Sequence, residues 1–249
     1  MSRQHLKGIA IATGLYRPAR LLERALIPSK CRDLQSGIDF YRQFIGQDDL
    51  CFDIGANRGN KTEMMLMLGA TVVSVEPQPD LVREIRARTA PYAHKSIVVQ
   101  SATGEREGVA KLNLRAESAF ATLLDDWVGQ ATGTLEVPIT TLDTLVKKNG
   151  IPRFIKLDVE GYESETLRGL SYPVPFLSLE YHCTNDGIAR AHTCIELLSR
   201  SGPVEINATL EEDYFFLLES WMSGADFRGN FPACLEQRLW GDLIVRRAI

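Results

Sequence analysis

Several apolar segments of this sequence end in acidic residues, a pattern that gathers carboxylates at one edge of a sheet. The first segment, residues 50 to 54, leads into a loop that holds Gly55, Ala56, Asn57 and Gly59. A strand that turns through glycines into a helix N-terminus is an arrangement that holds nucleotide-like ligands. Glu76 ends the second segment 21 residues after Gly55, near the spacing of about 20 residues at which an acidic side chain meets ribose hydroxyls. The spacing therefore predicts a ligand that contains ribose.

The loop departs from the dinucleotide pattern G-x-G-x-x-G, because Asn stands at positions 57 and 60. With no pyrophosphate to cradle, the residues favour a nucleoside with an amino-acid tail, S-adenosylmethionine. The same departure, with no Tyr-Lys or His pairing suited to hydride transfer, argues against a nicotinamide oxidoreductase.

A third segment, residues 154 to 163, carries Asp158 and Glu160, and a fourth ends in Glu180 and His182. Alternation along a strand predicts that Asp158 and Glu160 point to the same side. Asp158 is predicted to orient the methionine amino end or the acceptor. Glu160, Glu180 and His182 are candidates for binding the acceptor and removing its proton.

Together these segments resemble the FkbM-type family of S-adenosylmethionine-dependent methyltransferases. The matching residues are 53 to 59, Glu76-Pro77-Gln78-Pro79, and 155 to 163 with Leu167, Gly169 and Leu170. The resemblance implies O-methylation of a hydroxyl on a sugar, polyketide or other secondary metabolite. Residues 1 to 45 have no counterpart in the family's core, and Gln78 stands where the family more often has Asn.

The predicted site has two sets of residues. The cofactor set is Asp53, Gly55, Ala56, Asn57, Gly59, Glu76, Pro77, Gln78, Ser101, Ala102 and Asp158, and the catalytic set is Asp158, Glu160, Glu180 and His182. Structural alternatives stay open: Asp158 could cap a turn, His182 could be a satisfied loop residue, and Arg58 could face the cofactor carboxylate or solvent. Glu163 and Glu165 are expected in the solvated first turn of a helix.

No metal site is predicted, and the four histidines show no H-x-x-x-H spacing, which argues against a structural zinc site. The alternative is Mg²⁺ held by Asp158, Glu160 and Glu180 through oxygen ligands. The Asp-Asn pair expected of catechol-type enzymes is missing from residues 162 to 170.

A second functional alternative is a noncatalytic nucleotide-binding or assembly protein.

Composition narrows the class of protein. A chain of 249 residues with 45% hydrophobic content can form one sizeable α/β domain. Its net charge of -4 gives no reason to expect a nucleic acid partner, so the expected acceptor is a small molecule or glycan. Five cysteines without a C-x-x-C pair are typical of a reduced, cytoplasmic protein.

The N-terminal segment is basic, with seven Lys or Arg and one acid in residues 1 to 32. We expect residues 1 to 47 to form a helical extension that packs on the domain of residues 48 to 249, or on a second copy in a homodimer. The alternative is weak peripheral contact with a membrane surface. No segment is long and apolar enough to span one.

Strand-like and helix-like segments alternate along the rest of the chain. This order predicts a doubly wound, mainly parallel, seven-stranded sheet of the Rossmann-like class I methyltransferase type. The strands are expected at residues 50–54, 71–76, 97–99, 154–159, 176–181, 204–208 and 242–246. An added hairpin is expected from residues 109–114 and 134–139, and residues 212–222 are ambiguous between helix and strand.

Overall fold

The computed structural model describes residues 3–115, 121–124, 131–211, 213–235 and 240–247. The helices are α1 (Arg3–Ala12), α2 (Tyr16–Leu26), α3 (Pro28–Tyr41), α4 (Asn60–Met67), α5 (Pro79–Thr89), α6 (Leu142–Asn149), α7 (Glu163–Arg168), α8 (Asn185–Ser199) and α9 (Gly224–Leu235). The strands are β1 (Leu50–Ile54), β2 (Thr71–Val75), β3 (Ser96–Val99), β4 (Ala102–Thr103), β5 (Gly108–Leu114), β6 (Gly133–Thr140), β7 (Phe154–Leu157), β8 (Phe176–His182), β9 (Val204–Ala208), β10 (Met222–Ser223) and β11 (Trp240–Arg247).

The main sheet has the strand order β10-β9-β11-β8-β7-β1-β2-β3. Pairs β1–β2, β2–β3, β1–β7 and β7–β8 are parallel, and β11 is antiparallel to both neighbours. The predicted doubly wound fold is confirmed, with the two-residue strand β10 added to the seven predicted strands. The strand order reverses direction between β1 and β7, and ligands of such sheets bind at this switch point.

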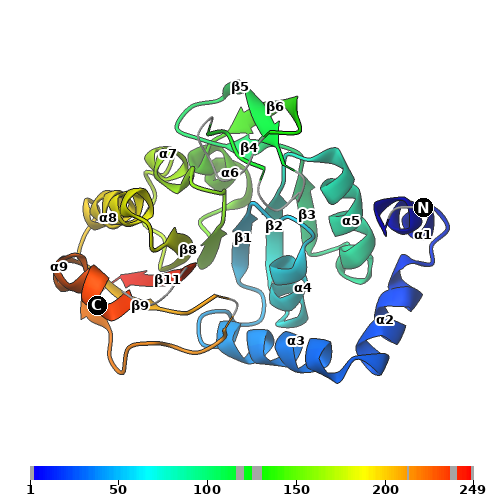
Figure 1. Ribbon diagram of the computed structural model, residues 1–249, viewed down its shortest axis with the longest axis horizontal. Coiled ribbons are helices and arrows are strands. Elements are labelled where there is room, and N and C mark those ends of the chain that lie inside the picture. Colours follow the sequence, from blue (N-terminus) through cyan, green and yellow to red (C-terminus); the bar gives the residue numbers. More distant parts are fainter. Residues whose placement is uncertain (1–2, 116–120, 125–130, 212, 236–239, 248–249) are drawn as a thin grey trace.

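The predicted hairpin forms from β5 and β6, which pair antiparallel from Gly108 to Leu114. Strand β4 joins β6 to give a separate three-stranded sheet. Figure 1 shows this small sheet at the top of the molecule, beyond the ends of β1, β2 and β3. The hairpin is thus placed to cover the edge of the main sheet where the acids lie.

Two hydrophobic clusters cover the two faces of the main sheet. Alternation along β1 sends Phe52 into one cluster and Cys51 into the other. The second cluster includes Tyr41 of α3 and Phe44, whose rings pack against Phe154 at centroid distances of 5.6 and 5.7 Å. Helix α3 therefore belongs to the hydrophobic core of the domain.

Helices α1 and α2 pack beside α5 at one edge of the molecule (Figure 1). Tyr16 donates a hydrogen bond of 2.8 Å to buried Glu84, which also pairs with Lys7. Arg88 pairs with Glu63 at 3.0 Å. None of the described helices has the length and apolar character needed to cross a membrane.

Two C-terminal segments differ from the sequence-based expectation. Residues 213–221 form neither helix nor strand, and the side chain of Asn207 bonds both backbone groups of Leu218 at 3.0 and 3.1 Å. Residue 212 lies outside the described residues. Helix α9 is not predicted, because two glycines and a proline within its 12 residues weaken the helical signal.

Candidate active site

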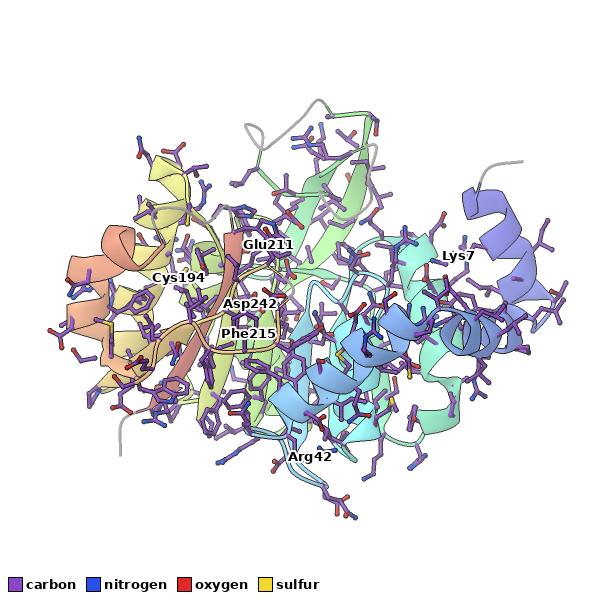
Figure 2. The ribbon with its side chains drawn as sticks, turned by 60° about the horizontal axis from the view of Figure 1, so that its bottom comes forward. Lys7, Arg42, Cys194, Glu211, Phe215 and Asp242 are labelled. Carbon is purple, nitrogen blue, oxygen red and sulfur yellow. The ribbon has the colours of Figure 1, made fainter. Side chains whose placement is uncertain are left out.

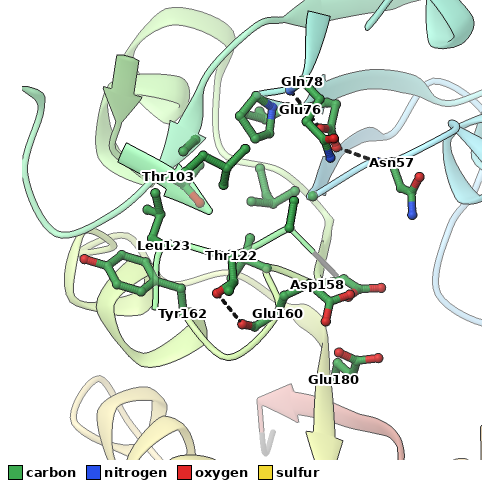
Figure 3. A pocket seen from close by; sticks show the side chains of 18 of the residues that line it. Asn57, Glu76, Gln78, Thr103, Thr122, Leu123, Asp158, Glu160, Tyr162 and Glu180 are labelled. Atoms are coloured by element: carbon green, nitrogen blue, oxygen red, sulfur yellow. Dashed lines mark hydrogen bonds between the residues drawn. The ribbon is translucent and has the colours of Figure 1, made fainter. Parts of the chain in front are cut away.

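A cavity of 910 Å³ opens at the carboxyl ends of β2, β1, β7 and β8. This volume lies within the range of about 300–1,000 Å³ typical of small-molecule sites. Many of the predicted site residues line it: Gly55, Asn57, Glu76, Pro77, Gln78, Ser101, Ala102, Asp158, Glu160, Glu180 and His182. Figure 3 shows Glu76 and Gln78 on one side of the cavity, and Asp158, Glu160 and Glu180 on another.

The loop after β1 forms the floor of this cavity through its backbone. The amides of Gly55 and Ala56 both donate to the Val75 carbonyl, at 2.9 and 3.0 Å. Gly55 and Gly59 have φ angles of 77° and 71°, and Asn57 has 48°. The left-handed backbone favours glycine at these positions, so the loop geometry explains the glycine spacing in the sequence.

Gly55 also lies against the loop that follows β7. A Cβ atom added at Gly55 would lie 1.7 Å from the Asp158 carbonyl oxygen, which is backbone and cannot rotate away. The nearest obstacle to a side chain at position 55 is therefore the protein's own backbone.

We expect Gly55→Ala to lower the free energy of unfolding by about 2–5 kcal/mol, from left-handed strain and overpacking together. Gly14→Ala is the matched control, because Gly14 has a φ of 73° with nothing within 4 Å of an added Cβ. Urea denaturation of both variants isolates the steric contribution. Equal losses would show that the close approach of the two loops is unimportant.

Glu76 is the most enclosed carboxylate of the cavity wall, with 3% of its surface exposed. It accepts backbone hydrogen bonds of 2.9 Å from both Asn57 and Gln78 (Figure 3). Burial raises the pKa of Glu76 to about 7, although these two bonds act in the opposite direction. The carboxylate is therefore oriented by backbone amides and changes its charge near neutral pH.

Three predicted cofactor residues do not line the cavity. Asp53 is buried and accepts a hydrogen bond from the Thr62 hydroxyl, and burial raises its pKa. Ala56 is 6% exposed, and a Cβ at Gly59 would lie 3.2 Å from Ile85. Asp53, Ala56 and Gly59 therefore contribute to the packing of the loop and not to the lining of the cavity.

Asp158 is held by a buried lysine that precedes it on β7. Lys156 Nζ lies 3.3 Å from Asp158 and 2.9 Å from Asp242 of β11. Burial lowers the pKa of Lys156, but the two carboxylates outweigh burial and leave the pKa well above its usual value. Lys156 is therefore a cation that fixes Asp158 and joins two separate strands.

Glu160, Glu180 and His182 form the acidic end of the cavity. One ligand atom from each lies within 4.8 Å of the others. His182 Nε2 lies 3.3 Å from Glu180 Oε2. Burial, and then the nearby Asp158 charge, raise the pKa of Glu180, whereas burial lowers the pKa of His182. This pair is an acid and a base that share one hydrogen bond.

Two expectations about this region are wrong. Strand β7 ends at Leu157, and Glu160 has a φ of 53°, so Asp158 and Glu160 reach the cavity from a turn and not by strand alternation. Glu163 is not solvated: it is 5% exposed and accepts the backbone amides of Val159 and Gly161, at 3.1 and 3.2 Å. Burial raises its pKa.

Some lining residues are not in the predicted cofactor or catalytic sets, among them Thr103, Thr122, Leu123, Tyr162, Glu211 and Trp240. Thr122 donates a hydrogen bond of 2.8 Å to the Glu160 carbonyl (Figure 3). It also pairs with Asn113 of β5. Residues 121–123 belong to the connection between β5 and β6, and all three line the cavity. Residues 116–120 and 125–130, with Trp127, lie outside the described residues.

A second cavity of 820 Å³ lies between α1, α2 and the domain. It is lined by charged residues of both signs, including Lys7, Arg58 and Asp213. Glu211 contributes to both cavities, and Figure 2 shows it near the centre of the view, close to Asp242 and Phe215. Arg58 is exposed and faces this second cavity, so the proposed contact with the cofactor carboxylate has no support in its position.

A family model described as the methyltransferase FkbM domain matches residues 53–228. In a comparison with curated proteins, nothing matches.

The chain also resembles solved structures at low sequence identity. Precorrin-6y C5,15-methyltransferase from Geobacter metallireducens is 13% identical, with 86% of this chain and 87% of that chain covered and a TM-score of 0.45. A TehB-like SAM-dependent methyltransferase from Corynebacterium glutamicum is 11% identical, with 93% and 100% covered and a TM-score of 0.44. Fibrillarin from Aeropyrum pernix, solved with S-adenosyl-L-methionine, is 8% identical, with 82% and 68% covered and a TM-score of 0.46. The match of the family model over most of the chain, with the motifs gathered around one cavity, shows that this protein belongs to the FkbM family of S-adenosylmethionine-dependent methyltransferases.

Proposed function

We propose that the protein transfers a methyl group from S-adenosylmethionine to a hydroxyl group of a small-molecule or glycan acceptor. The observation that carries the proposal is the Glu180–His182 pair, an acid and a base at the opposite end of the cavity from Glu76. A hydroxyl is a weak nucleophile until its proton is removed, so a base near the acceptor favours oxygen as the site of methylation.

The other end of the cavity fits the cofactor. Glu76 offers a buried carboxylate to the hydroxyls of a ribose, and Gln78 and Ser101 add polar groups beside it. Asp158, fixed by Lys156, is suited to the positive charge of the methionine amino group. S-adenosylmethionine, when bound, supplies a methyl group that is already activated, so the chain's own residues mainly hold and orient the reactants.

His182 is the group best suited to take the proton. Burial lowers its pKa, so its imidazole is neutral at neutral pH and can accept a proton from the acceptor hydroxyl. The imidazolium that forms can donate to the Glu180 carboxyl across the contact at 3.3 Å, and its positive charge favours ionised Glu180 against the effect of burial. The oxygen would then accept the methyl group that bound S-adenosylmethionine supplies, and the proton would remain on His182 until it passes to solvent.

The walls of the cavity suit a ring-shaped, hydroxylated acceptor. Tyr162 and Trp240 add flat rings to the lining, and Leu112 and Leu123 add apolar surface. Glu160 and Glu180 can accept hydrogen bonds from further hydroxyl groups. A sugar or polyketide presents both kinds of surface, which supports this acceptor class over a nucleic acid.

We also propose that the reaction needs no divalent metal. Glu180 and His182 are hydrogen-bonded to each other, and a metal held with Glu160 would have to replace that bond. Removal of metals with EDTA is expected to leave turnover unchanged. If EDTA abolished turnover and added Mg²⁺ or Mn²⁺ restored it, the proposal would be wrong. The cluster of Glu160, Glu180 and His182 would then be the candidate metal site.

The function is tested by methyl transfer from radiolabelled S-adenosylmethionine to a panel of sugars, glycans and polyketides. Mass spectrometry of the product then locates the methyl group on oxygen, nitrogen or carbon. Tight cofactor binding without transfer to any hydroxylated acceptor would favour a noncatalytic binding protein. A methyl group found on carbon or nitrogen would overturn the assignment of the acceptor atom.

Cofactor affinity is expected to fall as the pH drops through 7. Only the ionised Glu76 can accept bonds from both ribose hydroxyls, and its pKa is about 7. The dissociation constant of S-adenosylmethionine should therefore rise about tenfold between pH 8 and pH 6. Glu76→Gln should bind more weakly and show a flatter profile, because it cannot ionise. Titration calorimetry measures both profiles, and any ionisation of the cofactor itself affects the two proteins equally. Parallel profiles would show that Glu76 is not the source of the pH dependence.

A further inference from the structure

We propose that the outer face of α2, with the neighbouring ends of α1 and α3, docks on a bilayer surface that contains anionic phospholipid. The face is apolar and uncovered in the described part of the chain. Its exposed side chains are Ile9, Leu15, Leu21, Leu22, Leu26 and Ile27. Leu22 and Leu26 are 59% and 70% exposed, and exposed apolar surface gathered in this way marks an interaction site.

The orientation of α2 is fixed by polar contacts on a different side of the helix. Tyr16 is 4% exposed and donates to Glu84, and Arg20 lies 3.5 Å from Glu63. Tyr16 and Arg20 are four residues apart and share one helix face, whereas Leu15, Leu22 and Leu26 share another, at spacings of seven and four. The apolar face therefore points away from the domain.

The charge distribution decides between a membrane and a second copy of the chain. Residues 1 to 32 hold seven basic residues and one acid, a net charge of +6, so the rest of the chain carries -10 of the total of -4. A symmetric dimer through this face would bring two positive segments together. An anionic bilayer instead attracts this segment, and each Lys or Arg near such a surface contributes favourably.

The four basic residues of this segment whose side chains the structure describes take two positions relative to the domain. Lys7 and Arg20 contact Glu84 and Glu63 and face inward. Arg17 of α2 and Arg32 of α3 are exposed. An apolar stripe with exposed basic residues nearby is the composition of helices that lie in the plane of a membrane interface.

The length of the helix agrees with a surface position. Helix α2 has 11 residues, which gives a length of about 16 Å. That is too short to cross the hydrocarbon core of about 30 Å. Figure 1 shows α1 and α2 at the edge of the molecule, beyond α5 and away from the small sheet over the cavity. Docking through this edge therefore leaves the hairpin side of the cavity uncovered.

The test is co-sedimentation of the full chain with vesicles of phosphatidylcholine alone and with vesicles that also contain phosphatidylglycerol. We expect binding to the anionic vesicles and its loss at high salt. Leu22→Glu/Leu26→Glu should weaken binding by at least about tenfold, since it puts charge on the inserted face. Ile151→Glu is the matched control, because Ile151 is 52% exposed but lies after α6, and it should bind as the wild type does.

A second variant keeps the test independent of the apolar substitutions. Arg17→Glu changes an exposed side chain and should weaken binding to anionic vesicles only. Equal binding to both kinds of vesicle, no binding, or full binding by the double variant would overturn the proposal. So would sedimentation of a wild-type dimer that Leu22→Glu/Leu26→Glu dissociates, since a second copy would then cover the face. Vesicle binding needs no acceptor, so its failure is distinct from a failure of the proposed methylation.

Discussion

Replacing His182 with glutamine should lower turnover by about 10²–10⁴-fold, the usual contribution of a positioned base. Glutamine keeps a polar side chain in the cavity but cannot accept a proton. Because the variant leaves Glu76 and its two backbone bonds in place, the dissociation constant of S-adenosylmethionine should stay close to that of the wild type. The measurement is kcat with a verified acceptor, beside a calorimetric titration of the cofactor.

Glu180→Gln should reduce turnover in the same direction, since an amide stabilises the imidazolium less than a carboxylate does. For the wild type, turnover should fall only in acid, because burial lowers the pKa of His182 below its usual value of about 6.5. The neutral form is the base, so activity is present above that pKa and is lost as the pH falls through it. His182→Gln should lack this acidic limb.

Matched controls exist for both substitutions. His94 is exposed, and Glu196 has an exposed side chain on α8, so His94→Gln and Glu196→Gln should retain wild-type turnover. If His182→Gln kept the wild-type kcat, His182 would not be the base. Glu160 would then be the candidate for proton removal.

Asp158→Asn and Glu160→Gln separate binding from catalysis at the same end of the cavity. Asp158 already pairs with Lys156, which favours an orienting role, so Asp158→Asn should weaken cofactor binding more than it slows a saturated enzyme. Glu160 lies beside the His182–Glu180 pair, and Glu160→Gln should mainly raise the KM for the acceptor. If Glu160→Gln lowered kcat alone, Glu160 would take part in proton removal.

The sequence was sufficient to predict that Gly55, Asn57 and Glu76 lie together at one end of the cavity, because short-range signals specify their positions. A strand followed by glycines requires a tight turn, and Gly55 and Gly59 do adopt positive φ. The acid at the end of the next strand must lie beside that turn, since β1 and β2 pair in parallel with Asp53 opposite Ser74. The sequence alone could not show that Asp53 is buried under the loop whereas Glu76 lines the cavity. The burial of Asp53 depends on its contact with Thr62.

The end of the cavity around Glu160 was harder to predict because long-range contacts form it. Thr122 reaches the Glu160 carbonyl across 38 positions of the chain, and Trp240 comes from the last strand. Glu163 resembles an ordinary residue of a helical first turn, yet it accepts the amides of the turn that carries Glu160. Local sequence gives no signal for such contacts, since each needs the finished topology.

The role of Lys156 was missed for a related reason. A lysine inside an apolar strand is usually read as a break in the pattern, because a buried ammonium is costly unless it is paired. Its partners are Asp158, two positions away, and Asp242, 86 positions away. Both aspartates are present in the sequence, but only the order β11-β8-β7 brings Asp242 within reach.

Lys156→Met should therefore lower the free energy of unfolding by about 3–5 kcal/mol, the usual result of breaking a buried ion pair from one side. Methionine fills much of the same space, so the loss comes from Asp158 and Asp242, which would face each other without a cation. A domain of this kind has a total stability of about 5–15 kcal/mol, so the loss should be plain in urea denaturation. Lys147→Met, at an exposed position of α6, is the control and should change stability little.

A double-mutant cycle with Asp242→Asn tests whether the charge, and not the volume, is responsible. Asp242→Asn removes one of the two carboxylates that lysine neutralises, so the Lys156→Met/Asp242→Asn double variant should be more stable than the sum of the single losses predicts. Strict additivity, or a loss below about 1 kcal/mol in Lys156→Met, would contradict the pairing as the source of stability. Coupling would establish that one buried lysine both anchors β11 to the sheet and fixes the aspartate that faces the cavity.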